Sequence, residues 1–305
     1  LTGIAPPEIH LHTPGGITFC LPVEDAHMSG NAAVCTVRKD AGDDPDITNG
    51  VRITASVRRI EKGVTIEGGT GVGRITRPGL AMPVGEAAIN PGPRQQIADA
   101  VHRAAQQNGY GGGFSVTISV KDGEALAAQT YNGHLGIVGG ISILGTSGIV
   151  EPMSEKALVD TIRLELDSLY AQGQRIAFLC PGNYGADFAR DTLGLDLERA
   201  VKCSNFIGEA FDHAAYRGYP EILLVGHAGK LVKMAAGVMN THSSVADARQ
   251  EIFTAHAALC GAPRETLEGL MAAISVDACV ELLDEVNLRQ PVLSRIGRKM
   301  ETRIA

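Results

Sequence analysis

The pattern of apolar and polar residues changes near residue 135. Before that point the two kinds of residue mostly alternate, as at positions 8–12, 17–21 and 51–60, and this period of two predicts β-strands. The turn-forming triplet Pro14-Gly15-Gly16 separates the first two of these segments, which predicts a hairpin. One helical stripe begins near Pro93 and is followed by a further strand pattern.

Beyond residue 136 short apolar runs alternate with helical stripes. They follow one another at positions 141–144, 154–170, 175–179, 186–193, from about 207, and 222–225. This order predicts βαβ units and a parallel sheet, with the strand at 222–225 buried on both faces. We therefore expect an α/β protein of two domains: a strand-rich α+β domain at 1–135, and an α/β domain with a mostly parallel sheet at 136–305.

Composition narrows the class of protein. The chain has 305 residues, of which 44% are hydrophobic and 20% charged, values typical of a globular protein with more than one core. A net charge of −7 and the lack of a basic block argue against a nucleic-acid partner. We expect no membrane span, because no run of eighteen apolar residues occurs.

The cysteines and histidines show no metal-site spacing. The six cysteines are widely separated and lie among apolar or small residues, so we expect buried, reduced thiols and a cytoplasmic protein. His10 and His12 share one face of a predicted strand, but we see no cysteine or carboxylate partner near them and expect no metal site.

Small and polar residues follow four predicted strands. These loops are Gly145-Thr146-Ser147-Gly148, Pro181-Gly182-Asn183, Ser204-Asn205 and Gly226-His227. In a parallel sheet they open on one edge, where ligands bind in open α/β folds. Asn240 to Ser244 add five consecutive polar residues shortly afterwards. Such loops also favour Gly, Asn and Ser for their geometry alone, so a turn followed by a capped helix is the alternative.

Two other motifs have weaker interpretations. The glycine-rich stretch at 67–73 lacks the spacing of a dinucleotide-binding loop and leads into an extended segment, so a Rossmann fingerprint is not expected. The acidic stretch at 38–46 does not match a calcium-binding loop. It is either an Asp- and Gly-rich turn or a site loop in which Asp43 or Asp44 orients a substrate group.

Taken as strings, these segments closely resemble the CbiD family of cobalamin biosynthesis. The strings are Lys39-Asp-Ala-Gly-Asp-Asp-Pro-Asp, Gly71-Val-Gly, Arg77-Pro-Gly-Leu, Gly85-Glu-Ala-Ala-Ile-Asn-Pro, Gly145-Thr-Ser-Gly-Ile-Val-Glu-Pro-Met-Ser, Pro181-Gly-Asn, Ser204-Asn-Phe-Ile-Gly-Glu, Val225-Gly-His-Ala-Gly-Lys and Asn240-Thr-His-Ser. The resemblance covers nearly the whole chain. The family usually opens with a Gly-Tyr-Thr-Thr-Gly segment and an Ala-rich helix, and the sequence printed here starts downstream of both.

The resemblance implies a methyltransferase that uses S-adenosylmethionine to methylate C-1 of cobalt-precorrin-5B on the anaerobic corrin pathway. The cobalt corrinoid would be the small-molecule partner, and a homo-oligomer would be compatible with it. A nucleotide-dependent oxidoreductase and a non-catalytic corrinoid-binding protein are the alternatives. Methyl transfer needs an aligned, desolvated pocket more than a strong nucleophile, which agrees with the lack of a catalytic triad.

We assign site residues on this basis. Cofactor contacts are expected from Gly145, Thr146, Ser147, Gly148, Glu151, Gly182, Asn183 and Glu209. Cations and hydrogen-bond donors for the substrate carboxylates are expected from Arg74, Arg77, Arg94, Lys230, Lys233, Thr241, His242 and Ser243. Proton handling near the reacting carbon is assigned to His227 and Asp44.

Overall fold

The structure is a computed structural model that describes residues 1–13, 16–42, 46–145 and 155–304. Contacts divide the chain into two compact units, Leu1–Glu155 and Lys156–Ala305. The boundary expected after residue 135 falls inside the first unit. The reason is strand pairing: β9 (Ile137–Val138) and β10 (Gly140–Ile141) pair with short strands near residue 72.

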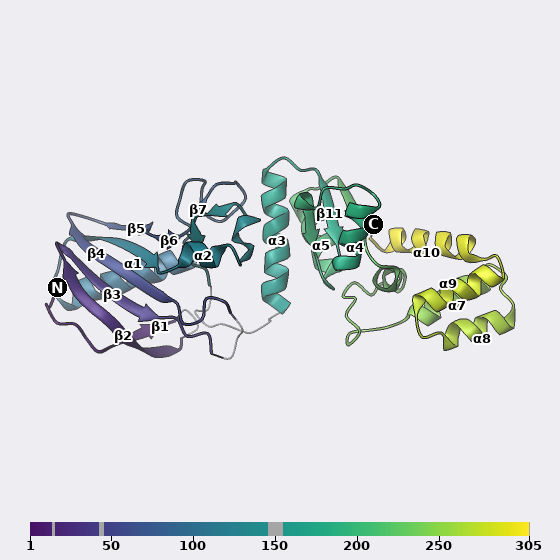
Figure 1. Cartoon of the computed structure of the whole chain (residues 1–305), viewed down its shortest axis with the longest axis horizontal. Helices are drawn as coiled ribbons and strands as arrows, with labels where there is room; N and C mark the ends of the chain where they lie inside the picture. The colour runs from purple at the N-terminus through teal and green to yellow at the C-terminus, as the bar shows by residue number, and fades with distance from the viewer. Residues whose placement is uncertain (14–15, 43–45, 146–154, 305) are drawn as a thin grey trace. The chain divides into compact units, whose positions relative to one another are not determined.

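A six-stranded mixed sheet forms the body of the first unit (Figure 1). Its strands, in spatial order, are β1 (Glu8–His12), β2 (Thr18–Ser29), β3 (Ala32–Arg38), β4 (Arg52–Ile60), β8 (Gly113–Val120) and β5 (Val64–Gly68). All neighbours are antiparallel except β5 and β8. The expected hairpin is confirmed as β1 and β2, which pair from Glu8↔Pro22 to His12↔Thr18.

Helix α1 (Pro91–Gln107) contributes its apolar stripe to the core of the first unit. Ile97, Val101 and Ala105 pack in one cluster with Val116 and Ile118 of β8. Smaller elements complete the unit: β6 (Gly71–Val72), β7 (Arg74–Ile75), α2 (Gly123–Ala127) and a 3₁₀ turn, η1 (Tyr131–Gly133).

The glycines at 68–73 serve close packing of backbone. A Cβ atom on Gly71 would lie 2.0 Å from the Val120 carbonyl oxygen, and one on Gly140 would lie 2.3 Å from the Gly71 carbonyl carbon. The segment continues as β6 and β7 and not as a helix. The expectation that this is no Rossmann loop is confirmed.

The second unit contains a parallel three-stranded sheet. Its order is β12 (Ala200–Lys202), β11 (Ile176–Cys180) and β13 (Glu221–Leu224). The flanking helices and turns are α3 (Glu155–Ala171), α4 (Asn183–Asp191), η2 (Leu197–Arg199), α5 (Ile207–Arg217), α6 (Ala228–Leu231) and η3 (Val232–Ala236). The α/β class with a parallel sheet is therefore confirmed for this part.

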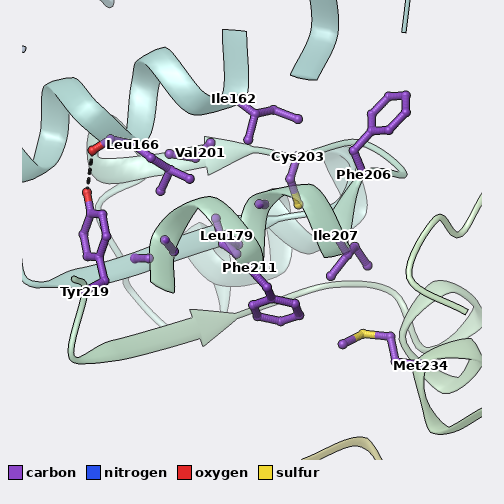
Figure 2. Packing of buried hydrophobic residues seen from close by; sticks show 13 residues of the cluster. Ile162, Leu166, Leu179, Val201, Cys203, Phe206, Ile207, Phe211, Tyr219 and Met234 are labelled. Carbon is purple, nitrogen blue, oxygen red and sulfur yellow. Dashed lines mark hydrogen bonds between the residues drawn. The ribbon is translucent and has the colours of Figure 1, made fainter. Parts of the chain in front are cut away.

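The strand at 222–225 is not buried on both faces, contrary to expectation. In β13, which lies at the sheet edge, Leu223 is 37% exposed, whereas Leu179 in the central strand β11 is fully buried. Figure 2 shows the surrounding core, in which Leu166, Leu179 and Ile207 pack together and the Tyr219 hydroxyl donates to the Leu166 carbonyl at 2.8 Å.

Four helices close the described chain: α7 (Arg249–Ala258), α8 (Arg264–Ala272), α9 (Val276–Glu285) and α10 (Arg289–Ile304). They share a second core that includes Phe253, Leu270, Leu283 and Val292. Across the described residues, no helix combines the length and apolar character that a bilayer crossing requires.

All six cysteines are free thiols, but their burial differs from the expectation. Cys180, Cys203 and Cys279 are buried, Cys35 and Cys260 are half-buried, and Cys20 is exposed. The prediction fails for Cys20 because it lies on a hairpin strand, β2, in which no residue is buried.

Candidate functional site

The carboxyl ends of the three parallel strands define a candidate site in the second unit. β11 leads through Gly182 into α4, β12 leads through Ser204 into α5, and β13 leads through His227 into α6. Gly182 and Ser204 adopt positive φ angles of 114° and 50°. Because parallel strands end on the same edge, these three loops lie together there. The fourth loop expected at this edge, at 145–148, follows β10, which pairs with β6 in the first unit, so the prediction of four loops on one edge is wrong for that loop.

Lys230 brings these loops together. Its Nζ donates to the Ser204 carbonyl oxygen at 3.4 Å and lies 3.7 Å from where a Cβ on Gly182 would stand. Burial lowers the pKa of the Lys230 ammonium, and the nearby Lys233 charge adds to this effect. The site thus holds a half-buried cation beside the N-terminus of α4, an arrangement that favours an anionic group.

Two buried thiols lie at the same strand ends: Cys180 is the last residue of β11, and Cys203 directly follows β12. The Cys203 backbone N–H donates to the Cys180 carbonyl at 3.2 Å. Burial raises the pKa of Cys180 to about 11 and that of Cys203 to about 12. Both remain protonated at neutral pH, so neither is suited to act as a thiolate nucleophile.

An exposed ring pair lies at the mouth of the same edge. The rings of Tyr184 and His227 have centroids 5.8 Å apart, and the Tyr184 side chain is 81% exposed. The Gly229 N–H donates to His227 Nδ1 at 3.1 Å, which leaves Nε2 free to face a ligand. Sequence reasoning missed Tyr184, although an aromatic residue directly after Gly182-Asn183 was a visible signal in a chain poor in aromatics.

The polar run at 240–244 is attached to this edge by backbone pairing. Thr241 N–H donates to the Asn205 carbonyl at 2.9 Å, and Asn240 forms a β-bridge with Phe206. His242 is exposed, and its Nδ1 lies 2.6 Å from Ser244 Oγ. Ser243 is exposed too, so the structure brings part of this run next to the predicted loops.

Lys233 and Thr241, which were expected to bind substrate, are buried inside the fold and do not face solvent where a ligand could reach them. Lys233 is only 3% exposed, and its Nζ donates to the carbonyls of Ala246 at 2.9 Å and Thr241 at 3.4 Å. Thr241 is 4% exposed, and its hydroxyl has no hydrogen-bond partner among the described residues. In this structure the Lys233 side chain stabilises the loop at 240–246 by hydrogen bonds, and the Thr241 side chain is packed within it.

The structure describes only some of the residues that the sequence assigned to the cofactor. Asn183 is exposed at the start of α4, and Glu209, in the first turn of α5, binds Arg163 of α3 at 2.7 Å. Gly145 belongs to the first unit and has a φ of 135°. Thr146, Ser147, Gly148, Glu151 and Asp44 lie outside the described residues.

The three arginines expected to bind substrate lie in the first unit. Arg94 donates to the carbonyls of Ile66, Ala87 and Ile89 and binds Glu86, so its guanidinium is used within the fold. Arg74 binds the Gly85 carbonyl at 3.0 Å and Glu67 at 3.1 Å. An open pocket of about 380 Å³ lies beside Arg94, lined by Val64, Ile66, Met82, Pro91, Gln95 and Ala98.

Arg77 differs from the other two arginines. Its side chain is exposed, and its guanidinium makes no ion pair with any residue in the described part of the chain. Its aliphatic stem passes so close to Gly136 that a Cβ there would lie 2.6 Å from the Arg77 Cγ. Gly136, with a φ of 74°, therefore leaves room for the arginine to lie across the backbone.

Comparison with known proteins gives consistent matches over most of the chain. A family model described as CbiD matches residues 1–152, and one described as the CbiD C-terminal domain matches residues 240–305. The cobalt-precorrin-5B C(1)-methyltransferase of Ruminiclostridium cellulolyticum is 51% identical, over 96% of this chain and 77% of that protein. The protein of the same name from Citrobacter koseri is 42% identical, over 97% of this chain and 78% of its own.

One solved structure also matches. It is the cobalamin biosynthesis protein CbiD of Archaeoglobus fulgidus, at 28% identity and a TM-score of 0.40, over 80% of this chain and 75% of that one. From the two family models and the curated relatives, the resemblance noted in the sequence is confirmed: this chain belongs to the CbiD family.

Proposed function

We propose that this chain is a cobalt-precorrin-5B C(1)-methyltransferase. The observation that carries the proposal is its 51% identity to a protein of that name over 96% of the chain. The structure supports it with a parallel sheet whose strand ends gather a cation, a helix N-terminus and two exposed rings. A non-catalytic corrinoid-binding protein and an oxidoreductase are not favoured.

S-adenosylmethionine is our proposal for the methyl donor, and the residues at the strand ends of the second unit fit it. Lys230, which the sequence assigned to the substrate, lies beside the N–H groups at the start of α4, so we now assign it to the carboxylate of the cofactor. Gly182 leaves open backbone beside them. The exposed ring of Tyr184 suits its adenine. When bound, the sulfonium supplies an electrophilic methyl group, which a nucleophilic ring carbon of the corrin accepts as the carbon–sulfur bond breaks.

The remaining cofactor residues stay in the proposal with different support. Asn183 is exposed at the site and can donate a hydrogen bond. Glu209 would have to exchange its ion pair with Arg163 for the ribose hydroxyls. Gly145 to Gly148 and Glu151 lie in the longest of the strings that resemble the family, and their assignment to the cofactor rests on that resemblance.

Substrate binding is assigned to side chains that can meet a carboxylate. Arg77 is the foremost because its guanidinium is exposed and makes no ion pair with the described residues. His242 and Ser243 are exposed near the strand ends, whereas Arg74, Arg94, Lys233 and Thr241 would act mainly by holding their loops in place. His227 and Asp44 are proposed to handle protons near the reacting carbon.

Turnover with methyl-labelled S-adenosylmethionine and cobalt-precorrin-5B tests the function directly. One labelled methyl group per macrocycle at C-1, followed by mass spectrometry, would establish the reaction. Binding of the corrinoid without label transfer would favour the carrier alternative. A matched pair of variants tests the proton-handling role. His227→Ala should lose activity and flatten its pH dependence, while His213→Ala, which removes a hydrogen bond between α5 and Asp167, should leave the pH dependence unchanged.

A further inference from the structure

We propose that the β1–β2 hairpin binds a divalent cation of the zinc class through Glu8, His10 and Cys20. One potential ligand atom from each of these side chains lies within 4.8 Å of those of the other two. The hairpin belongs to the first unit and shares no residue with the site described above. The proposal does not depend on the methyltransferase assignment.

The strand register explains why the three side chains meet. His10 on β1 pairs directly with Cys20 on β2, and Glu8 lies two residues from His10. Because side chains alternate along a strand, Glu8 and His10 project from the same face, and the paired Cys20 projects from that face as well. Cys20 is a partner of His10 that could not be found from spacing in the sequence, because the two residues come together only when the hairpin forms.

The distances already approach those of a metal site. His10 Nε2 lies 3.7 Å from a Glu8 carboxylate oxygen. In a tetrahedral zinc site with bonds of about 2.0–2.1 Å to nitrogen and oxygen, neighbouring ligand atoms are about 3.4 Å apart. Small rotations of exposed side chains would therefore complete the geometry.

The donor set selects the kind of cation. An imidazole nitrogen, a carboxylate oxygen and a thiolate sulfur are the three ligand types of zinc, whereas calcium and magnesium prefer oxygen ligands alone. All three residues are exposed, so a hydrated ion can reach them. Three protein ligands leave a fourth position for water.

Titration of the metal-free chain with Zn²⁺, and separately with Co²⁺ as a spectroscopic probe, tests the proposal. We expect one ion per chain by calorimetry and a thiolate-to-cobalt charge-transfer band in the near ultraviolet. Cys20→Ser should abolish that band, and His10→Ala or Glu8→Gln should weaken Zn²⁺ binding about tenfold or more. These side chains are exposed, and far-ultraviolet circular dichroism checks that each variant remains folded.

Matched controls come from the same sheet. His27→Ala removes an exposed histidine that lies 2.9 Å from Asp25 but has no cysteine beside it, and Cys35→Ser removes the half-buried cysteine of β3. Both should bind Zn²⁺ and Co²⁺ as the parent chain does. The proposal is overturned if no ion binds, if Cys20→Ser keeps the charge-transfer band, or if the controls weaken binding as much as the three ligand variants.

Discussion

At the scale of single residues, the partial burial of Lys230 affects the charge that it can offer a ligand. Its ammonium donates to the Ser204 carbonyl and lies beside Gly182, and burial lowers its pKa. An amine with a lowered pKa is charged below that value and loses its charge as the pH rises through it. The attraction for an anionic ligand should therefore be complete at low pH and decline at a lower pH than for an ordinary lysine.

Binding of S-adenosylhomocysteine as a function of pH tests this role of Lys230. We expect the dissociation constant of the parent chain to rise before the pH reaches about 10.4, the ordinary lysine value. Lys230→Met should weaken binding about tenfold at neutral pH, as expected for a charged hydrogen bond, and should remove the part of the pH dependence that comes from this lysine. The control Lys62→Met alters an exposed turn lysine of the first unit. Equal affinities of Lys230→Met and the parent chain would remove Lys230 from the site.

Gly71 provides a residue-scale test of the packing of the first unit. A Cβ there would lie 2.0 Å from the Val120 carbonyl oxygen, and the residue has a φ of 77°. Gly71→Ala should therefore lower the free energy of unfolding by about 3 kcal/mol or more. Gly111→Ala is the control, because a Cβ at Gly111 meets no atom within 4 Å, and it should change stability by no more than about 0.5 kcal/mol. Urea unfolding measures both.

At the scale of elements, periodicity predicted most of the helices and strands but not the position of each strand in its sheet. The helix expected at 154–170 is observed as α3 (Glu155–Ala171), and the strand expected at 175–179 as β11 (Ile176–Cys180). The prediction that residues 222–225 are buried on both faces was wrong, because an apolar run of residues can form either an edge strand or a central strand of a sheet. Which strand is central depends on pairing between distant segments, and a single sequence does not encode that locally.

Two leucines test the order of the parallel sheet. Leu179 in β11 is fully buried, so Leu179→Ala should lower the free energy of unfolding by about 3 kcal/mol through lost contacts and a residual cavity. Leu223 in β13 is 37% exposed, and Leu223→Ala should cost about 1 kcal/mol or less. Equal costs in urea unfolding would contradict the placement of β13 at the edge.

At the scale of the whole molecule, the sequence predicted the fold class and three of the four strand-end loops expected at one sheet edge, but it missed contacts that only folding creates. Family strings identified the methyltransferase class, while the three residues of the hairpin cluster are invisible as a motif. Tyr184 was also missed. Its ring centroid lies 5.8 Å from that of His227, a residue more than forty positions away in the sequence, and only the fold brings the two together. Local patterns specify elements, whereas sites require the pairing of elements.

The division into two units yields a final prediction. Each buried cluster described here draws its residues from one unit: the cluster around Val116 and Ile118 from the first, and those around Leu179 and Phe253 from the second. Because each unit holds its own hydrophobic core, we expect residues 1–155 and 156–305 to fold as separate chains with cooperative thermal transitions. The first should retain Zn²⁺ binding through the hairpin, and the second should retain detectable S-adenosylhomocysteine binding through Lys230. Leu179→Ala gives the internal control, since it should lower the melting temperature of 156–305 and leave that of 1–155, mixed in the same sample, unchanged. A half that stays unfolded would show that its core needs the other unit, and a folded second half without cofactor affinity would assign the decisive contacts to residues of the first.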